Sequence, residues 1–551
     1  MPPQPKKTAI LIFIAVFVVG LAWPVYTKHA WEDYYITYRA SKNLAMGHGL
    51  TFTEGERVHS FTSPLGTLLP ALCSVVTGNR SDDDALWIFR IMSLAAYAGA
   101  GIFLWKLVRS IHASAGPAWL VLVLFAIDTK IVDFTTNGME TGILLLFLGW
   151  TLHASITTPR RQALHLGIAW AGLMWTRPDS FVYIAAISIG AFLFCPPPTP
   201  AGGRWGWIKI FLTAGVITSL LYLPWIIWAW SYYGTPVPHT ITAKGLFHPP
   251  MTPASLLKSA WDFPRAVTTH VDMLATTFMP AYSSITGWPT WMLRIAYWIA
   301  LGCMTVWLMP GIKRETRLAS FALCAGEFYL TSFVYFPVPW YIPTLTVFAL
   351  IVLSGLVGQL VASHKNWRTF AWAFSGLLVA GSLTITLLSA HEMRLQEAVI
   401  ERGERQAIGL WLREHASSNR DTVFLECLGY IGFYSNLKMY DFPGMSSPEM
   451  VAARKKIGVA SYPESWPALI QELSPDWLVL RSNEAETIRQ LNPGMLKRDY
   501  SLAKTFDVRA QVDAIPFIMG RNYLANDAYF EVYHRSVEKK KPQPFRAAAL
   551  K

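Results

Sequence analysis

The stretch Trp31-Glu-Asp-Tyr-Tyr-Ile-Thr-Tyr-Arg39 decides how the rest of the chain is interpreted, because it places two adjacent acids directly after the first apolar run. Glu32 and Asp33 are therefore expected at a membrane surface, where neighbouring charges are costly unless they serve a purpose. A plainer interpretation is a solvated acidic pair at a helix end. The surrounding pattern favours an active site built on the outer face of a polytopic membrane protein.

The composition places the chain in the membrane class. Of its 551 residues 53% are hydrophobic and only 15% are charged, whereas a soluble protein carries about a quarter charged residues. The net charge of +12 comes from short basic clusters between apolar runs, which is typical of cytoplasmic loops rather than of a nucleic-acid-binding face. The five cysteines show no paired spacing, so we expect neither a disulfide framework nor a zinc site.

The apolar runs predict about eleven transmembrane helices. The expected spans are 8–23, 85–105, 118–127 (extended to 132), 138–153, 164–175, 181–194, 207–230, 291–309, 318–333, 341–361 and 369–388. The first run could be a signal peptide, but no cleavage pattern follows it convincingly, so we interpret it as a retained first span with a cytoplasmic N-terminus. The run 65–76 is about half the length needed to cross and is expected to lie in the interface.

The distribution of basic residues supports this topology. With 65–76 in the interface, the cytoplasmic connectors carry at least two basic residues each: Lys106 and Arg109, Arg160 and Arg161, Arg204 and Lys209, Lys313, Arg314 and Arg317, and Lys365 and Arg368. If 65–76 crossed the membrane, all of these would face outward, against the positive-inside rule. The outer face then collects the first outer loop 27–84, the turns 128–140, 176–179 and 336–340, the long outer loop 231–290 and everything after the last span.

The composition changes near residue 391, which divides the chain into a transmembrane catalytic domain, 1–390, and an extracytoplasmic domain, 391–551. Short β-rich runs at 422–426, 438–442, 476–480 and 528–532 predict a small α/β domain. Gly429-Tyr-Ile-Gly432 lacks the full glycine-rich dinucleotide motif, so no nucleotide site is predicted. Residues from about 538 are expected to form a disordered basic tail.

The outer face has the side chains that a group transfer to a hydroxyl requires. Asp33 or Glu32 can supply a carboxylate as base or nucleophile, and Glu140 lies at the same level. Arg177 and Lys244 are candidate partners for a phosphate leaving group. His239 could bind that phosphate or shuttle a proton.

Each candidate also has an ordinary structural explanation. Glu140 could equally cap its helix, and Lys244 could contact lipid headgroups. His239 could be a turn residue, and Trp340-Tyr341 could be an interfacial aromatic anchor. Arg39 could pair with an acid, and Glu426 could be a residue at the end of a strand. Glu140, Arg39, Trp340 and Tyr341 are nevertheless our candidates for residues that support the site or bind the acceptor.

The first outer loop carries a family resemblance. Its motifs are Glu32-Asp-Tyr-Tyr-Ile-Thr-Tyr-Arg39, Asn43, Gly47-His-Gly49, Gly55-Glu-Arg-Val58 and Thr62-Ser-Pro-Leu65. Together they resemble the GT-C glycosyltransferases related to the terminal arabinofuranosyltransferase AftB, and pilin-modifying relatives. Further similar pieces follow in order: Gly138-Met-Glu-Thr141, Thr176-Arg-Pro-Asp179, Tyr233-Gly-Thr-Pro-Val-Pro-His239 with Lys244, Trp411-Leu-Arg413, Gly429-Tyr-Ile-Gly432 and Tyr440-Asp-Phe-Pro-Gly444. The likeness covers most of the chain.

The resemblance implies transfer of a monosaccharide, D-arabinofuranose or a similar sugar, from a polyprenyl phosphate to a hydroxyl of a glycan or a pilin-like protein. It implies that Asp33 acts on the acceptor hydroxyl or on the anomeric carbon, that Arg177 and Lys244 stabilise the departing phosphate, and that helices within 34–76 hold the prenyl chain. The family's acids are commonly Asp-Asp, so Glu32 departs from the pattern; it could hold a divalent cation or contact phosphate directly. His239 stands where a small polar residue such as Asn is expected.

Three alternatives stay open from the sequence. A mannose or glucose transferase would share the fold, and a lipid-linked sugar transporter or a lipid-glycan-binding assembly factor would share the membrane setting. A transporter favours midplane charges and internal repeats. The main intramembrane ionisable residues are Arg90 and Glu327, and we see no repeat. The sequence therefore predicts a multi-pass enzyme of the cytoplasmic membrane with its active site and C-terminal domain on the periplasmic or extracytoplasmic side.

Overall fold

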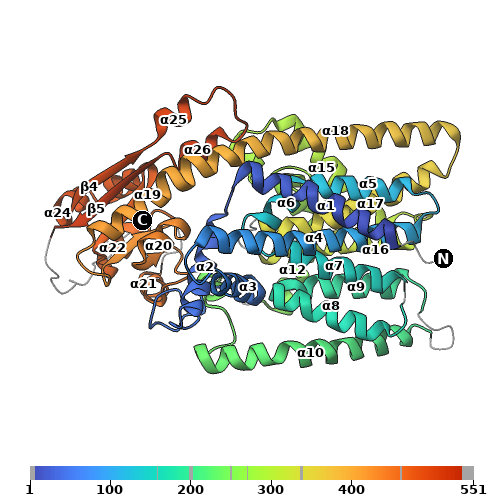
Figure 1. Cartoon of the computed structure of the whole chain (residues 1–551), viewed down its shortest axis with the longest axis horizontal. Coiled ribbons are helices and arrows are strands. Elements are labelled where there is room, and N and C mark those ends of the chain that lie inside the picture. The colour runs from blue at the N-terminus through green and yellow to red at the C-terminus, as the bar shows by residue number, and fades with distance from the viewer. Residues whose placement is uncertain are drawn as a thin grey trace.

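The computed structural model describes residues 6–157, 159–197, 203–248, 251–269, 271–334, 339–458 and 462–536. Long helices form a bundle with roughly parallel axes, and a smaller domain with a β-sheet lies at one end of it (Figure 1). This arrangement confirms the predicted class, a polytopic helical protein with a C-terminal α/β domain. The expected basic tail lies outside the described residues.

The first part of the chain folds into helices of very different lengths. They are α1 (Lys6–Thr27), α2 (Glu32–Ala45), α3 (Pro64–Val76), α4 (Asp82–Ile111), α5 (Gly116–Ile127), α6 (Thr129–Thr136), α7 (Thr141–Thr157), α8 (Gln162–Thr176), η1 (Pro178–Ser180), α9 (Phe181–Phe194), α10 (Trp205–Tyr233), α11 (His239–Lys244), α12 (Pro253–Thr269), α13 (Val271–Ala275), α14 (Ser283–Thr286), α15 (Thr290–Thr305), η3 (Val306–Leu308), α16 (Arg314–Phe333), η4 (Pro339–Tyr341), α17 (Ile342–Val361) and α18 (Lys365–Leu395).

Each of the eleven predicted apolar runs coincides with a helix. Within the described residues, six helices are long and apolar enough to cross a membrane by length and composition, or seven if the bent pair α6 and α7 counts as one span. Helices α5, α8 and α9 are shorter, and α16 carries four charged residues. The protein is thus a multi-pass membrane protein, while the number eleven stays a prediction.

The predicted cytoplasmic connectors gather at one end of the bundle. The Lys313 ammonium, between α15 and α16, donates to the carbonyl of Ile111 at the end of α4, 2.7 Å away. The loop between α17 and α18 lies at the same end as the N-terminus, opposite the C-terminal domain (Figure 1). This clustering of basic loops is the arrangement that the positive-inside rule requires.

At the opposite end, the segment predicted as a turn between two spans contains the helix α6, which is bent by 120° from α7. Arg90 on α4 holds this region together, because its guanidinium donates to the carbonyls of Thr136 and His29 at 2.6 and 2.5 Å. The second intramembrane ionisable residue, Glu327, accepts a long hydrogen bond of 3.5 Å from Thr277. Both side chains therefore have structural contacts.

The chain leaves the bundle through a continuous helical axis. Helix α18 passes into a π-helical stretch, η5 (Gln396–Arg405), and then into α19 (Gln406–His415), so the predicted domain boundary falls inside a helix. Figure 1 shows this axis reaching from the far end of the bundle into the C-terminal domain. Glu397 on η5 accepts hydrogen bonds from the backbone N–H of Ala30 and from the hydroxyl of Tyr430. The π-helical turn thereby fixes the segment that precedes the paired acids.

The C-terminal domain is a five-stranded sheet with helices. Its strands are β1 (Thr422–Leu425), β2 (Lys438–Asp441), β3 (Trp477–Arg481), β4 (Tyr500–Asp507) and β5 (Tyr529–Arg535), in the order β2-β1-β3-β5-β4. Its helices are α20 (Gly429–Ser435), α21 (Pro448–Ile457), α22 (Trp466–Leu473), α23 (Ser482–Leu491), α24 (Met495–Asp499), α25 (Arg509–Asp513) and α26 (Arg521–Asn526).

The strand pairing explains which strands the sequence revealed. β1 pairs in parallel with β2 and β3, and these three strands, with β5, match the four predicted runs. β4 was not predicted, because it is an edge strand whose residues are mostly exposed and so show little apolar alternation. The carboxyl end of β1 points to the junction with the bundle, where α20 packs on α2.

Candidate active site

Helix α2 presents the paired acids at its first turn. Trp31 is in extended conformation and precedes the helix, so Glu32 and Asp33 occupy its first two positions, where the helix dipole favours negative charge. Buried tyrosines at positions 34, 35 and 38 fix the opposite face of the helix; the rings of Tyr34 and Tyr38 stack with centroids 5.0 Å apart. The acids are thus held on a rigid element.

The two acids have different surroundings. Glu32 is joined to the C-terminal domain: one carboxylate oxygen lies 2.9 Å from the Arg405 guanidinium, and the other accepts a 3.2 Å hydrogen bond from the backbone N–H of Gly429. Asp33, next to it, has neither a hydrogen bond nor an ion pair through its carboxylate among the described residues. Asp33 is half-buried and therefore remains available to a substrate.

Charges from both parts of the chain act on Asp33. Burial raises the pKa of Asp33 above its ordinary value; Lys244 opposes this shift and Glu426 adds to it. Arg177 and Arg405 also act to lower that pKa. Asp33 therefore lies in a field of three cations and at least one further acid, and the net shift moves its pKa upward, in the direction of neutral pH.

Arg177 follows the outer end of α8 and is surrounded by acids and an aromatic ring. Its guanidinium lies 3.5 Å from the carboxylate of Glu140 and 3.3 Å from that of Asp179, and 4.3 Å above the ring of Tyr341. Burial alone would lower the pKa of Arg177, but these neighbours outweigh it and the net shift is upward. The site therefore contains a permanently charged guanidinium, and Glu140, Asp179 and Tyr341 all belong to its surroundings.

Lys244 is the second cation of the site, and it is exposed at the end of the short helix α11. Its ammonium lies 5.9 Å from the ring centroid of Trp340, which is itself buried and packs edge-on against Trp31 at 6.2 Å. The remainder of the turn predicted at 336–338 lies outside the described residues. Trp340 and Trp31, which we call the aromatic wall, thus connect Lys244 with the position directly before the paired acids.

Two predicted site residues have other contacts. The backbone N–H of His239 donates to the carbonyl of His59, and the Nε2 atom of His239 is buried without a hydrogen-bond partner among the described residues. Arg39 is buried and donates to the carbonyls of Gly432 and Leu437 at 2.7 and 2.9 Å, so it joins α2 to the C-terminal domain. A role in binding substrate stays a prediction for both.

The C-terminal domain adds residues to the site that the sequence did not reveal. Arg405 is almost completely buried and contacts Glu401 at 2.9 Å and Asp527, in addition to Glu32. Glu426, interpreted from the sequence only as the end of a strand, contributes to the raised pKa of Asp33. Its carboxylate lies 2.7 Å from the guanidinium of Arg481. No local sequence pattern marks these residues, because their roles arise only when the domain packs on α2.

An apolar groove opens beside the site at the outer end of α8. Its lining residues are Leu44, Leu50, Leu68, Trp175, Pro224, Trp225 and Trp228, from α2, the loop after it, α3, α8 and α10. The rings of Trp175 and Trp225 are 5.7 Å apart. Among the lining residues, Trp175 is close to the site along the chain, because it precedes Arg177 by two residues.

A divalent cation at this site was left open by the sequence. Within the described part of the chain, no group of three or more histidine, cysteine, aspartate or glutamate side chains is arranged to hold a metal ion. Glu32, the predicted supporting ligand, has one carboxylate oxygen beside Arg405 and the other bonded to a backbone N–H. These contacts occupy both oxygens of Glu32, and a role for a divalent cation stays a prediction.

Two known enzymes are similar in sequence to part of the chain. A terminal β-(1→2)-arabinofuranosyltransferase of Corynebacterium glutamicum is 27% identical over 315 residues, covering 52% of this chain and 43% of that protein. The enzyme of the same description from Mycobacterium tuberculosis is 25% identical over 259 residues, covering 43% of this chain and 38% of that protein. The chain thus spans less than half the length of the curated relatives that it matches.

The structural similarity extends over nearly the whole chain. The archaeal oligosaccharyltransferase AglB from Archaeoglobus fulgidus, in complex with an inhibitory peptide and a dolichol-phosphate, superposes with a TM-score of 0.54 at 11% identity, covering 91% of this chain and 73% of that one. The chain has the GT-C fold. In addition, residues 391–533 match the model of a domain of unknown function, DUF8728. This GT-C protein is therefore arabinofuranosyltransferase-like in sequence, as the first outer loop predicted.

Proposed function

We propose that this protein is a membrane glycosyltransferase that moves D-arabinofuranose from a polyprenyl phosphate to a hydroxyl of a glycan on the outer side of the cytoplasmic membrane. The observation that carries the proposal is the carboxylate of Asp33, which has no hydrogen bond among the described residues and is influenced by the charges of Lys244 and Arg177. The similarity to two terminal arabinofuranosyltransferases supports the choice of sugar.

In the proposed reaction Asp33 accepts the proton of the acceptor hydroxyl as that oxygen bonds to the anomeric carbon of the donor sugar. The bond between the anomeric carbon and the phosphate oxygen breaks, and the electron pair leaves with the polyprenyl phosphate. A positioned general base of this kind contributes roughly 10²- to 10⁴-fold to a rate. The raised pKa of Asp33 suits the role, because a base works best when its pKa approaches the working pH.

The leaving phosphate carries the negative charge that develops in the reaction. Arg177 offers a planar fork of donors, and its neighbours Glu140 and Asp179 fix its orientation. Lys244 is exposed and reaches into the site as a mobile point charge. Cations of this kind stabilise charge in the transition state better than water does, because they are already oriented in a partly buried site.

The apolar groove between α2, α3, α8 and α10 supports a lipid-linked donor. It is lined entirely by tryptophan, leucine and proline side chains, and its Trp175 precedes Arg177 by two residues, so a prenyl chain in it would present its phosphate to the two cations. The AglB structure holds a dolichol-phosphate, a lipid of the same chemical class. The basic connectors at the far end of the bundle support a cytoplasmic location for that end, and hence an extracytoplasmic location for the site.

The experiment that tests the proposal is a transfer assay with purified protein in detergent. It offers a labelled polyprenyl-phosphate arabinofuranose with a panel of glycan acceptors, and compares the wild type with Asp33→Asn. Asp84→Asn is the matched control, because Asp84 is also an acid in the first turn of a helix but is exposed and lies outside the site. We expect transfer by the wild type and the control only.

The outcomes separate the alternatives. Transfer from mannose or glucose donors, but not from arabinofuranose, would retain the reaction class and refute the sugar. Binding of the donor without turnover would favour an assembly factor. Full activity of Asp33→Asn would remove the central claim.

A further inference from the structure

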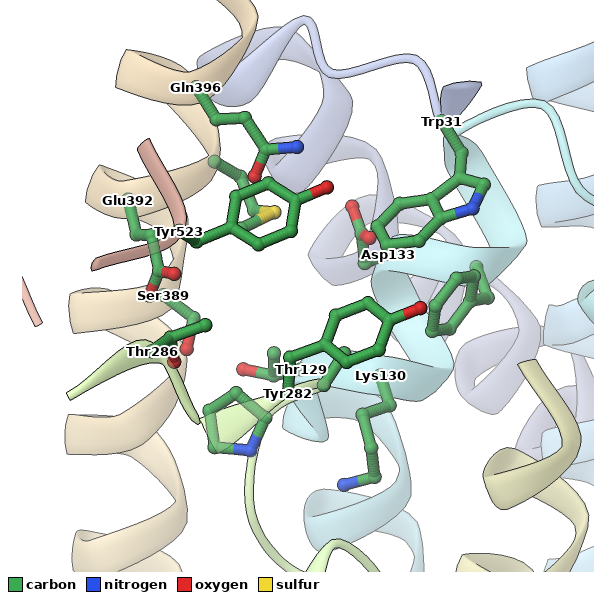
Figure 2. Close-up of a pocket in the computed structure, with 14 residues that line it drawn as sticks. Trp31, Thr129, Lys130, Asp133, Tyr282, Thr286, Ser389, Glu392, Gln396 and Tyr523 are labelled. Carbon is green, nitrogen blue, oxygen red and sulfur yellow. The ribbon is translucent and has the colours of Figure 1, made fainter. Parts of the chain in front are cut away.

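A second pocket, which has both apolar and polar lining residues, lies beyond Trp31, between the bundle and the C-terminal domain (Figure 2). Its walls come from α6, from the end of the long outer loop, from the outer end of α18 and from α26. The lining residues are Trp31, Thr129, Lys130, Asp133, Phe134, Pro280, Ala281, Tyr282, Thr286, Ser389, Glu392, Met393, Gln396 and Tyr523. The proposed catalytic residues are not among them, although Trp31 directly precedes the paired acids.

One wall of this pocket carries polar atoms that have no hydrogen-bond partner among the described residues. These are the hydroxyls of Thr286 and Ser389 and the Oε2 atom of Glu392, whose carboxylate has the indole N–H of Trp288 as a neighbour outside strict hydrogen-bond geometry. All three residues are at most 4% exposed. Figure 2 shows the three side chains directed toward one another on the side of the pocket formed by α18. Buried polar groups left without partners are costly, so this wall is suited to a ligand that supplies hydroxyl groups.

The Glu392 carboxylate packs directly against the backbone at Gly520. A side chain at Gly520 would place its Cβ only 1.6 Å from the Glu392 Oε1 atom, so only glycine can stand there without displacing the acid. The remaining charged members of the pocket have partners: Asp133 accepts from Trp23 and His29, and Lys130 pairs with Asp128 at 3.2 Å. The unsatisfied hydrogen-bonding capacity is therefore concentrated on one wall.

Aromatic rings form the opposite boundary. The ring of Tyr282 is nearly parallel to that of Trp31, with centroids 6.3 Å apart and an interplanar angle of 15°, and to that of Tyr523, at 6.1 Å and 14°. A set of parallel aromatic faces opposite carboxylate and hydroxyl groups combines an apolar surface for the C–H face of a ring with polar groups for its hydroxyls. That pairing matches the chemistry of a sugar residue better than that of a lipid chain or an inorganic anion.

The pocket lies on the far side of the aromatic wall from the phosphate-binding cations. From Lys244 the contacts run through Trp340 and Trp31 to Tyr282, which lines the pocket. Tyr282 is also close enough to Asp33 for the carboxylate to add to the raised pKa of the phenol, after burial as the main cause. Asp33 is thus influenced by the cations of the site and itself influences Tyr282, which lines this pocket.

We propose that this pocket, whose volume is about 30 Å³, receives the hydroxyl-bearing edge of a sugar residue of the glycan acceptor, with its hydroxyls on Thr286, Ser389 and Glu392 and its ring against Tyr282. The inference rests on the proposed function, because it assumes that the acceptor must enter opposite the leaving phosphate. It adds a specificity-determining surface to which the C-terminal domain contributes through Tyr523.

The test uses the full-length protein and the double variant Thr286→Val/Ser389→Ala, which removes two hydroxyls with little change of shape. The matched control is Thr316→Val/Ser93→Ala, because those hydroxyls are equally buried and equally without partners among the described residues but lie away from the pocket. The measurements are KM for an arabinofuranosyl oligosaccharide acceptor, KM for the polyprenyl-phosphate donor, release of free sugar from the donor to water, and calorimetric binding of the oligosaccharide alone.

We expect the pocket variant to raise the acceptor KM and dissociation constant by roughly 10-fold or more, the loss of two neutral hydrogen bonds. Donor KM and sugar release to water should stay at the wild-type values, and the control should change none of the four quantities. An unchanged acceptor KM and dissociation constant in the pocket variant would overturn the inference while leaving the proposed function intact. The oligosaccharide could bind the wild type but not the pocket variant while the wild type transfers no sugar from any polyprenyl phosphate. That result would support the sugar-binding role of the pocket and refute the proposed function.

Discussion

The two adjacent acids should respond in opposite ways to neutralisation, because the structure gives them different neighbours. Asp33→Asn removes a carboxylate that makes no hydrogen bond or ion pair among the described residues, whereas Glu32→Gln removes the charge that faces Arg405 at 2.9 Å. We therefore expect the first substitution to abolish transfer without unfolding the protein. The second should weaken the attachment of the C-terminal domain and reduce transfer only moderately.

The magnitudes follow from the contacts. Hydrogen bonds to charged groups contribute about 1.5–3 kcal/mol, but burial raises the pKa of Glu32 to about 8 although Arg405 opposes this shift, and the side chain is 20% exposed, so we expect the contact with Arg405 to contribute only about 1 kcal/mol. The folded-state pKa of Asp33 is raised, so its ionised form opposes folding at any pH above the unfolded-state pKa. Asn at this position removes that opposition, and the free energy of unfolding should be unchanged or higher.

Transfer rates and unfolding measured on the same preparations check both expectations. Asp33→Asn should lose roughly 10²- to 10⁴-fold in kcat, the contribution of a positioned base, with full stability in an SDS titration. Glu32→Gln should lose about 10-fold or less in kcat, together with about 1 kcal/mol of stability. If Glu32→Gln were inactive and Asp33→Asn active, the assignment of Asp33 as the base and of Glu32 as the contact to the C-terminal domain would be refuted.

Changes at four further residues test the charges and the backbone around the site. Lys244→Gln removes a charge that lowers the pKa of Asp33, so the acidic limb of the kcat/KM profile should move to higher pH, and Glu426→Gln should move it to lower pH; pH shifts of the reverse sign would contradict these assignments. Arg405→Gln leaves buried acids without their partner and should cost about 3 kcal/mol in an SDS titration, more than Arg405→Lys. Gly138→Ala should lower the unfolding temperature measurably, because Gly138 has φ +99° and its Cβ would lie 2.4 Å from a tyrosine ring; an unchanged value would show that this turn relaxes freely.

The helical bundle was predictable because apolar length and basic flanks are local properties of the sequence. All eleven apolar runs fold as helices, and the four predicted strands are present. The short helix α6 escaped prediction because it contains Lys130 and Asp133, whose burial becomes possible only through partners on other segments. Local hydropathy cannot represent that kind of compensation.

The site was predictable to the extent that its residues follow the outer ends of predicted spans. Glu140 and Arg177 lie at such ends and are paired in the structure at 3.5 Å. Arg405 could not be found in this way: with Glu401 four residues earlier, it has the spacing of an ordinary surface ion pair on a helix. Only the docking of the C-terminal domain turns that pair into a buried support for Glu32.

The charge of the proposed base is set jointly by the bundle and the C-terminal domain. Lys244 and Arg177 follow membrane helices, whereas Arg405 and Glu426 belong to the C-terminal domain. Arg405 acts to lower the pKa of Asp33, and Glu426 acts to raise it. Removing the domain would therefore alter the base through both of these charges and would also release Glu32 from its anchor. For this reason we regard the C-terminal domain as part of the proposed catalytic machinery, because it supplies Arg405 and Glu426, two of the four charged residues that act on Asp33.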